Sequence, residues 1–260
     1  MAGVNDLFGL EGRTALITGA GGGLGRAIAE LFGGAGARLI LLDRDDAILE
    51  PVVAALRAKG TEVVAIAADL IDTAGLKAKA LSLVQQGDVP DCLVLNAGMQ
   101  GPAGPLGDIS EEDWQAVMTV NLVSAHALTS VFVPVMARRG GGSIVLMASI
   151  SALRGNKAIG LYSLTKAALA QLARNLAVEW GPLNIRANAI APGLIRTPLA
   201  RDLMGNSGFM VRRLSMTPLR RVGEPEEIAA TALYLASNAG AFTTGQTIVV
   251  DGGTLISDGS

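Results

Sequence analysis

The stretch Thr14-Ala15-Leu16-Ile17-Thr18-Gly19-Ala20-Gly21-Gly22-Gly23-Leu24-Gly25 joins a short apolar run to a glycine-rich turn. A helix-like pattern, Arg26-Ala27-Ile28-Ala29-Glu30, follows without a break. Glycines let the backbone turn sharply and approach a pyrophosphate, and the N-terminus of the next helix offers free N–H groups and partial positive charge. Such a motif also occurs in ordinary βα loops, but a strand, turn and helix in this order predict a dinucleotide-binding turn.

A second apolar run, Leu39–Leu42, ends at Asp43, which lies 18 residues beyond Gly25 (43 − 25). A carboxylate at this place can accept hydrogen bonds from an adenosine ribose and would repel a 2′-phosphate. The position therefore favours NAD over NADP. Two other interpretations stay open, because an acid after a strand also caps helices, and because Arg44 could meet a phosphate.

Short apolar runs alternate with longer helix-like segments along the whole chain. Runs that are apolar on both faces predict strands that are covered on both sides, and the alternation implies right-handed crossovers and a parallel sheet. Strands are expected at 14–18, 38–43, 62–67, 92–95, 143–148, 186–190 and 247–250. Helices are expected near 24–36, 45–59, 73–86, 111–138, 160–180 and 225–236. The pattern predicts an α/β fold with a doubly wound, mainly parallel, seven-stranded sheet and helices on both faces.

The residue counts exclude several catalytic chemistries. The 260 residues include one histidine, His126, and one cysteine, Cys92. A nucleophile–histidine system would have a single candidate base, and a Cys/His zinc site needs three or four ligands, so no metal site is expected. A single cysteine also excludes an intrachain disulfide and fits a reducing cytosol. We expect His126 to be packed or at an interface, and Cys92 to be a buried thiol.

Charge and hydropathy limit the partners. The formal net charge is −2, so the chain offers no basic surplus to nucleic acid. Residues 1–12 carry acids and no apolar run, which is unlike a signal peptide. No stretch is expected to reach the roughly 18 apolar residues of a membrane span. We therefore expect a cytoplasmic protein that binds neither nucleic acid nor membrane.

Tyr162 and Lys166 lie four residues apart at the start of a strong helical pattern, and so on one helix face. A lysine cation there would lower the tyrosine pKa from about 10. Such a tyrosine can exchange a proton with an alcohol or ketone while hydride moves at a nicotinamide. The spacing alone is common on amphipathic helices. Ser149, 13 residues before Tyr162 (162 − 149), adds a hydroxyl at a strand end; Ser151 is its rival, and either serine could instead cap local backbone.

Together these motifs resemble the short-chain dehydrogenase/reductase family, from about Leu10 to Gly253. Five separated motifs agree in order and spacing: the turn Thr18–Gly25, Asn96-Ala97-Gly98, Asn121, the set Ser149, Tyr162 and Lys166, and Pro192-Gly193. The resemblance implies one Rossmann-like domain over residues 1–260. It would have a cofactor half at about 10–150, a catalytic and substrate half at about 140–260, and a mobile flap at about 197–217.

The resemblance also implies catalytic roles. Tyr162 would be the general acid/base, and Lys166 would bind the nicotinamide ribose and lower the tyrosine pKa. Ser149 would orient and polarise the substrate oxygen, and Asn121 would hold a water in a proton relay that reaches Lys166. The residue before Ser149 is Ala148, where the family usually has a first serine, but the second serine is the catalytic one.

The same resemblance implies a set of cofactor-binding residues beside Tyr162 and Lys166. Asp69 and Leu70 would face the adenine, Asn96 would stabilise the central sheet, and Ile195 and Thr197 would contact the carboxamide and phosphate side of NAD. Gly22 stands where NADP-dependent relatives often carry a basic residue, which agrees with NAD. The implied set is Gly19, Gly22, Gly23, Leu24, Gly25, Asp43, Asp69, Leu70, Asn96, Ala97, Gly98, Pro192, Gly193, Ile195 and Thr197.

We therefore expect an NAD-dependent, homotetrameric oxidoreductase that acts on a small secondary alcohol or its ketone. Its subgroup resemblance is to bacterial polyol, sugar-acid and 3-oxoacyl reductase-like enzymes. Two alternatives stay open. One is a 3-oxoacyl-carrier-protein reductase that uses NADPH, against which Asp43 and the five lysines count. The other is a non-catalytic dinucleotide-binding regulator, against which the intact catalytic set counts.

The substrate pocket is expected to form from Met99, Ser149, Leu153, Ile159, Tyr162 and the 197–217 flap. The basic residues nearby could meet an anionic substrate, but such side chains are more often solvated. They are Arg154, Lys157, Arg201, Arg212 and Arg213.

Overall fold

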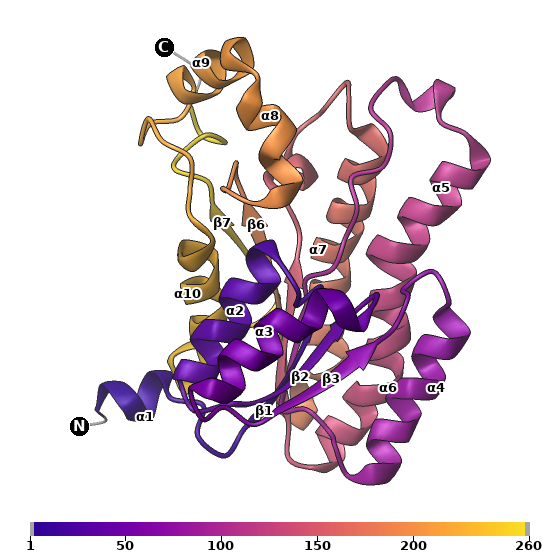
Figure 1. Ribbon diagram of the computed structural model, residues 1–260, viewed down its shortest axis with the longest axis vertical. Helices are drawn as coiled ribbons and strands as arrows, with labels where there is room; N and C mark the ends of the chain where they lie inside the picture. The colour runs from indigo at the N-terminus through magenta and orange to yellow at the C-terminus, as the bar shows by residue number, and fades with distance from the viewer. Residues whose placement is uncertain (1–2, 258–260) are drawn as a thin grey trace.

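One sheet of seven parallel strands lies at the centre of the computed structural model, which describes residues 3–257 (Figure 1). Its order is β3-β2-β1-β4-β5-β6-β7, and every neighbouring pair is parallel. The strands are β1 Thr14–Thr18, β2 Arg38–Asp43, β3 Val63–Ala67, β4 Cys92–Leu95, β5 Gly142–Met147, β6 Ile185–Pro192 and β7 Thr247–Val250. The predicted doubly wound sheet is confirmed, and the strand order reverses between β1 and β4.

Helices cover both faces of this sheet (Figure 1). They are α1 Val4–Phe8, α2 Gly23–Gly34, α3 Asp46–Ala58, α4 Thr73–Gln86, α5 Glu111–Met118, α6 Ser124–Arg138, α7 Gly160–Trp180, α8 Arg201–Gly205, α9 Ser207–Ser215 and α10 Pro225–Ala236. The six predicted helices are present within one or two residues, except that a π-helical turn at Thr119–Val123 divides the segment 111–138. Helices α1, α8 and α9 were not predicted, and the last two lie within the expected flap.

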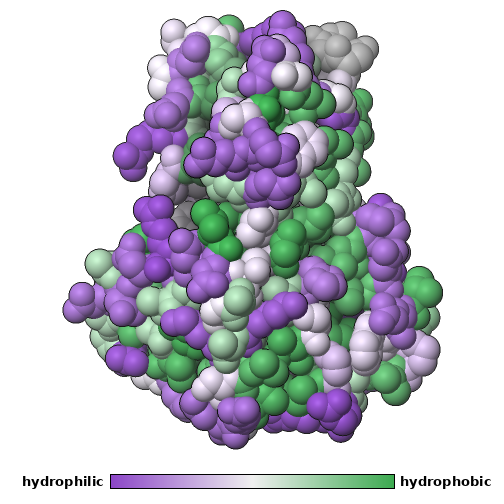
Figure 2. Space-filling view, turned by 90° about the vertical axis from the view of Figure 1, so that its right-hand side faces the viewer, coloured by the Kyte–Doolittle hydropathy of each residue, from purple (hydrophilic) through white to green (hydrophobic). Residues whose placement is uncertain are grey.

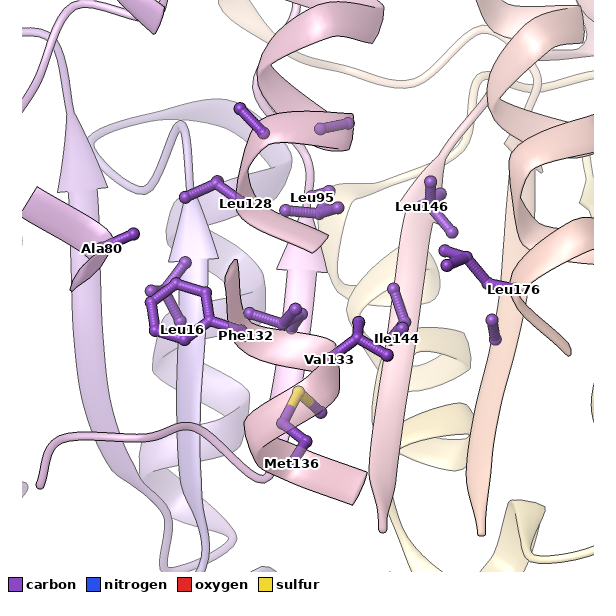
Figure 3. Close-up of a cluster of buried hydrophobic side chains, with 14 of the residues drawn as sticks. Leu16, Ala80, Leu95, Leu128, Phe132, Val133, Met136, Ile144, Leu146 and Leu176 are labelled. Carbon is purple, nitrogen blue, oxygen red and sulfur yellow. The ribbon is translucent and has the colours of Figure 1, made fainter. Parts of the chain in front are cut away.

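The side chains of the strands alternate between two apolar layers. In β1, Leu16 packs into a cluster with residues of α4, α6 and α7, whereas Ile17 packs into a second cluster with residues of α2, α3 and α10. Figure 3 shows the first cluster, in which Phe132 and Leu128 of α6 lie near Leu16 and Leu95. Successive strand residues point to opposite faces, so a run that is apolar at every position needs cover on both sides.

Local side-chain bonds fix where several helices begin. The N–H of Asp113 donates to the Ser110 hydroxyl at 3.1 Å ahead of α5, and the N–H of Ile48 donates to Asp45 Oδ1 at 2.9 Å ahead of α3. Helix α4 ends at Gly87, whose φ of 85° is the left-handed conformation that glycine adopts without strain. These capping bonds satisfy backbone donors that have no partner inside a helix.

One helical stretch bears on the expectation about membranes. The continuous helical stretch Glu111–Arg138 is long and apolar enough to cross a bilayer by length and composition alone. Half of its most apolar window is buried within the molecule, and two of its own residues, Phe132 and Val133, lie in the core. Figure 2 views this side of the molecule, where hydrophobic surface alternates with polar side chains. The apolar residues of this stretch therefore serve to pack α6 on the sheet.

The two rare residues lie in different surroundings. Cys92 is buried in β4, and burial raises the pKa of its thiol to about 12, so it is a poor nucleophile. His126 is exposed on α6, so it is not packed within this chain. The apolar neighbours Ala125 and Ala127 are buried instead, because a helix turns by about 100° per residue and separates adjacent side chains.

Candidate active site

A cavity of about 800 Å³ lies along the carboxyl ends of the parallel strands, within the size range of small-molecule sites. Its wall contains residues that end or follow six strands, β1 to β6: Gly19, Asp43, Asp69, Asn96, Ser149 and Gly193. Every site residue predicted from the sequence lines this cavity except Gly25 and Asn121, which lie behind the wall. The strand order therefore brings together predicted site residues that are up to 178 positions apart in the sequence (197 − 19).

The glycine turn lets β1, α2 and the cavity meet without side chains between them. Gly19 and Gly23 have φ angles of 66° and 52°, a region that other residues rarely adopt. A Cβ added at Gly25 would overlap the carbonyl oxygen of Gly19. A Cβ added at Gly22 would meet no atom within 4 Å. The turn thus brings bare backbone and the start of α2 to the cavity wall, as anion binding requires.

Asn96 ties the ends of β4 and β1 together beneath this turn. Its Nδ2 donates to the carbonyl oxygens of Thr18 at 3.0 Å and Gly19 at 3.2 Å. The backbone N–H groups of Asn96 and Ala97 both donate to the Thr18 hydroxyl, at 3.0 and 3.1 Å. These bonds hold the turn against the next strand and match the structural role implied for Asn96.

Asp43 ends β2 beside the glycine turn. Its Oδ2 accepts from the N–H of Gly21 at 2.9 Å, and its Oδ1 accepts from the N–H of Arg44 at 2.8 Å. A carboxylate offers about four lone pairs, so acceptor capacity remains toward the cavity that Asp43 lines. Arg44 also lines the cavity, but its side chain is largely exposed and lies 3.9 Å from Asp45.

Ser149, Tyr162 and Lys166 converge at the far end of the cavity. Ser149 follows β5 and hydrogen-bonds the Tyr162 side chain. The buried Lys166 Nζ lies 5.4 Å from the centroid of the Tyr162 ring and donates to the carbonyl oxygen of Met147 at 2.8 Å. The Ser149 hydroxyl also accepts from the N–H of Ser151 at 3.2 Å, so it caps local backbone as well as facing the tyrosine.

The pKa of Tyr162 differs from the sequence-based expectation. Burial raises the pKa of its hydroxyl, and the hydrogen bond with Ser149 lowers it in part. Burial also lowers the pKa of Lys166 to about 8. The expected depression of the Tyr162 pKa by Lys166 is not found in this geometry, where burial is the largest influence on that pKa and raises it.

Asn121 lies in the π-helical turn and is buried behind the cavity. Its Oδ1 accepts from the N–H of Met99 at 2.8 Å, and its Nδ2 donates to the Met99 carbonyl and the Thr165 hydroxyl, both at 2.9 Å. A Cβ added at Gly98 would lie 3.2 Å from that Oδ1 and 3.0 Å from Lys166 Nζ. The side chain thus fixes the Met99 loop, and the implied water relay stays a prediction.

The substrate end differs in part from the expected pocket. Met99 and Ile159 line the cavity, whereas Leu153 is exposed and does not. Of the nearby basic residues, Arg154 and Arg213 line it, although solvated side chains were expected more often. Lys157, Arg201 and Arg212 are exposed and do not line it. Sequence reasoning missed several wall residues with ordinary apolar or amide side chains: Ile48, Ile71, Gln100, Val120, Asn156 and Leu194.

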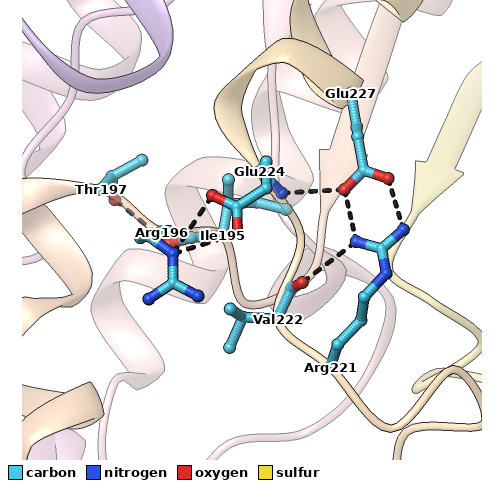
Figure 4. Close-up of polar contacts among 7 residues, drawn as sticks. All are labelled: Ile195, Arg196, Thr197, Arg221, Val222, Glu224 and Glu227. Atoms are coloured by element: carbon cyan, nitrogen blue, oxygen red, sulfur yellow. Dashed lines mark hydrogen bonds and ion pairs between the residues drawn. The ribbon is translucent and has the colours of Figure 1, made fainter.

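Two ion pairs lie beside the wall segment that contains Ile195 and Thr197, and the first of them holds it directly (Figure 4). Arg196 Nε donates to both carboxylate oxygens of Glu224, at 3.0 and 3.2 Å. Arg221 pairs with Glu227 through two bonds of 2.6 and 2.8 Å, and this pairing helps to lower the pKa of Glu227 to about 2. The first pair joins the wall to the start of α10, and nothing in the local sequence pattern singled out either pair.

Comparisons with known proteins agree with this geometry. A family model described as enoyl-(acyl carrier protein) reductase matches residues 19–254. Dehydrogenase/reductase SDR family member 4 of Oryctolagus cuniculus is 35% identical, over 97% of each chain. A gluconate 5-dehydrogenase from Burkholderia cenocepacia, in complex with NADP and tartrate, superposes with a TM-score of 0.93 at 32% identity, over 98% of this chain and 100% of that one. A 7α-hydroxysteroid dehydrogenase complexed with NADH superposes with a TM-score of 0.91 at 34% sequence identity, over 97% of this chain and 98% of that one.

The glycine turn gives a direct test of the close approach at Gly25. Gly25→Ala is expected to lower the free energy of unfolding by about 1–3 kcal/mol, since the added methyl group overlaps backbone that cannot move freely. Gly22→Ala is the matched control, expected to change it by less than about 0.5 kcal/mol because the site is open. Urea unfolding measures both. Equal effects at the two positions would show that packing does not decide the turn.

Proposed function

The chain belongs to the short-chain dehydrogenase/reductase family, and from that premise we propose that it transfers hydride between NAD(H) and a secondary alcohol or its ketone. The observation that carries the proposal is the meeting of Ser149, Tyr162 and Lys166 in one cavity with the glycine turn and Asp43. A substrate carbon placed beside Tyr162 would therefore lie in the same cavity as the surface suited to a dinucleotide.

The residues present fit a dinucleotide. The bare backbone at Gly19 and Gly23 suits a pyrophosphate, and Asp43 is placed for a ribose. When bound, the nicotinamide supplies or accepts the hydride. In this proposal the remaining implied residues hold the cofactor as the resemblance describes, with Asp69 and Leu70 toward the adenine.

In reduction, Tyr162 Oη gives its proton to the carbonyl oxygen while hydride reaches the carbonyl carbon; in oxidation it takes that proton from the alcohol. Ser149 holds the same oxygen through its hydroxyl. The ammonium of Lys166 stabilises the phenolate that remains after reduction, and Asn121 organises the loop beside it. The raised pKa of Tyr162 keeps its proton in place until a carbonyl oxygen arrives.

NAD is the proposed cofactor because a carboxylate stands at the end of β2. The 2′-phosphate of NADP would meet the negative charge of Asp43, and Gly22 offers no cation to offset it. The similar enzymes named above carry NADP in one case and NADH in the other. The choice therefore depends on this chain's own residues.

The proposal includes a cytoplasmic homotetramer with small-molecule partners. Large apolar side chains stay exposed on the π-helical turn, on α7 and on β7: Val123, Leu164, Val178 and Val249. Subunit contacts would remove this surface from water. We also propose that residues about 10–150 hold the cofactor, that about 140–260 carry catalysis and substrate, and that 197–217 moves as a flap.

A 3-oxoacyl-carrier-protein reductase is the second candidate; the description of the matching family model names a carrier-protein substrate, although for enoyl reduction. It predicts a preference for NADPH and for thioester substrates. Asp43 opposes the preference for NADPH. The chain has five lysines, which provide little basic surface for an acidic carrier protein. Reduction of a 3-oxoacyl thioester with NADPH, at rates above those of free ketones with NADH, would favour this candidate.

The acid/base role is tested by Tyr162→Phe. Removing the hydroxyl is expected to lower kcat/KM about 10²- to 10⁴-fold, as loss of a general acid does, while NADH binding measured by fluorescence stays unchanged. Tyr234→Phe is the matched control, since its hydroxyl bonds Thr243 at 2.7 Å away from the cavity. The readout is a panel of alcohols, polyols and hydroxy acids followed by NADH absorbance. Turnover that survives in Tyr162→Phe refutes the assignment.

The pH profile tests the bond between Ser149 and Tyr162. Alcohol oxidation needs the phenolate, so its kcat/KM rises with pH toward the pKa of Tyr162, which lies above the usual value. Ser149→Ala removes a contact that lowers this pKa, so the rise is expected to move to higher pH. Ser151→Ala is expected to leave its position unchanged. A shift with Ser151→Ala alone would make the rival serine the partner.

Cofactor choice is tested by Asp43→Asn. Loss of one negative charge is expected to lower the ratio of kcat/KM for NAD over NADP by about tenfold or more. Asp69→Asn is the matched control, because it removes a cavity carboxylate that follows β3 instead of β2. A wild-type preference for NADP, or an equal effect of the two variants, would contradict the role of Asp43.

A further inference from the structure

Two arginines line the cavity near Ser149 and Tyr162, and neither has a counterion among residues 3–257. Arg154 follows Ser149 on the same loop, and Arg213 lies on α9. Neither side chain forms an ion pair or hydrogen bond with any residue of the described range 3–257. The Arg213 guanidinium lies 5.4 Å from the ring centroid of Phe209, its own neighbour on the helix.

Within the described residues, no ion pair neutralises either of these two positive charges. Burial and the charge of Arg154 both lower the pKa of Arg213, which shows that the two guanidiniums act on each other. Among residues 3–257, the opposing charge that acts on Arg213 is Asp251, whose oxygens accept from the N–H groups of Gly253 and Leu255 at 2.8 and 2.7 Å. Like charges held together in a partly buried wall favour an anion between them.

Charge is also segregated along the cavity. Its lining carboxylates, Asp43 and Asp69, end or follow β2 and β3 at one edge of the sheet. Arg154 follows β5, three strands away from β2, and Arg213 comes after β6. At that edge Arg44 also lines the cavity beside the carboxylates, whereas Lys166, Arg154 and Arg213 line the end beside Ser149 and Tyr162, so an anionic group is favoured there.

We propose that Arg154 and Arg213 together bind an oxyanion on the substrate, so that the preferred alcohol or ketone carries a carboxylate. Guanidinium groups recognise such groups through paired, charge-assisted hydrogen bonds. This assignment rests on the proposed function, since it names the substrate class of the same site. A phosphate ester shares the chemistry and is separated from a carboxylate by the choice of substrates.

The test compares an anionic with a neutral substrate on the same carbon skeleton: two acids with their amides, and one phosphate ester with its alcohol. Gluconate and gluconamide, 3-hydroxybutyrate and 3-hydroxybutyramide, and sorbitol 6-phosphate and sorbitol form the panel, with NAD present. The wild type is expected to favour each acid over its amide by about 10- to 100-fold in kcat/KM, the effect of one charged hydrogen bond or more. The phosphate pair is expected to give a smaller ratio.

Arg154→Met and Arg213→Met are each expected to cut the ratio of kcat/KM for an acid over its amide about tenfold or more. Arg213→Lys is expected to keep more of the acid preference than Arg213→Met, since lysine has the positive charge but lacks the paired N–H donors of a guanidinium. Arg212→Met is the matched control, because this neighbouring arginine on α9 is exposed and does not line the cavity. Preference retained in both Met variants would overturn the proposal.

A second readout separates this proposal from the proposed function. The thermal midpoint of the wild-type chain with NAD is measured with each acid and amide, which reports binding without turnover. Suppose that acids raise the thermal midpoint more than amides do, and that this difference disappears in Arg213→Met. The anion site is then supported even if no substrate reacts, and only the oxidoreductase proposal fails. Turnover of neutral alcohols with no acid preference in either readout overturns the anion site. If the ratio of kcat/KM for sorbitol 6-phosphate over sorbitol exceeds the acid-over-amide ratios, the preferred oxyanion is a phosphate and the proposed carboxylate is wrong.

Discussion

The absence of a side chain at Gly25 is the constraint on which the rest of the molecule depends. No Cβ fits against the carbonyl oxygen of Gly19, so α2 starts directly at the end of β1. That contact brings helix N–H groups to the cavity wall, and Asn96 then fixes the same turn to β4. The cavity follows from these two contacts, because the loops after the other parallel strands open at the same edge of the sheet.

Buried polar groups set up the opposite end of the cavity. Lys166 is 3% exposed and is held by the Met147 carbonyl, and Asn121 is 1% exposed and is held by Met99 and Thr165. Buried groups of this kind are costly unless they are paired. Their pairing fixes the helix face that carries Tyr162 and so sets the position of its hydroxyl beside Ser149.

The sequence predicted the architecture well, because runs such as Leu39–Leu42 are apolar at every position and need cover on both faces. It could not show the π-helical turn, since Val120-Asn121-Leu122 is as compatible with an α-helix. It gave the wrong direction for the pKa of Tyr162, because spacing shows a nearby lysine but does not show burial. Likewise, Arg212 and Arg213 are identical in type, and only the tertiary position of α9 places one of them in the cavity wall.

The most direct measurement of the central claim follows the hydride itself. The chain is incubated with NADH that carries deuterium at both C4 positions and a panel of ketones and oxo acids, beside a matched run with NADPH labelled in the same way, and the products are analysed by mass spectrometry. The account predicts one deuterium on the carbinol carbon, transferred much faster from NADH than from NADPH. Products without deuterium in both runs, or a bound dinucleotide that stays unchanged, would contradict it.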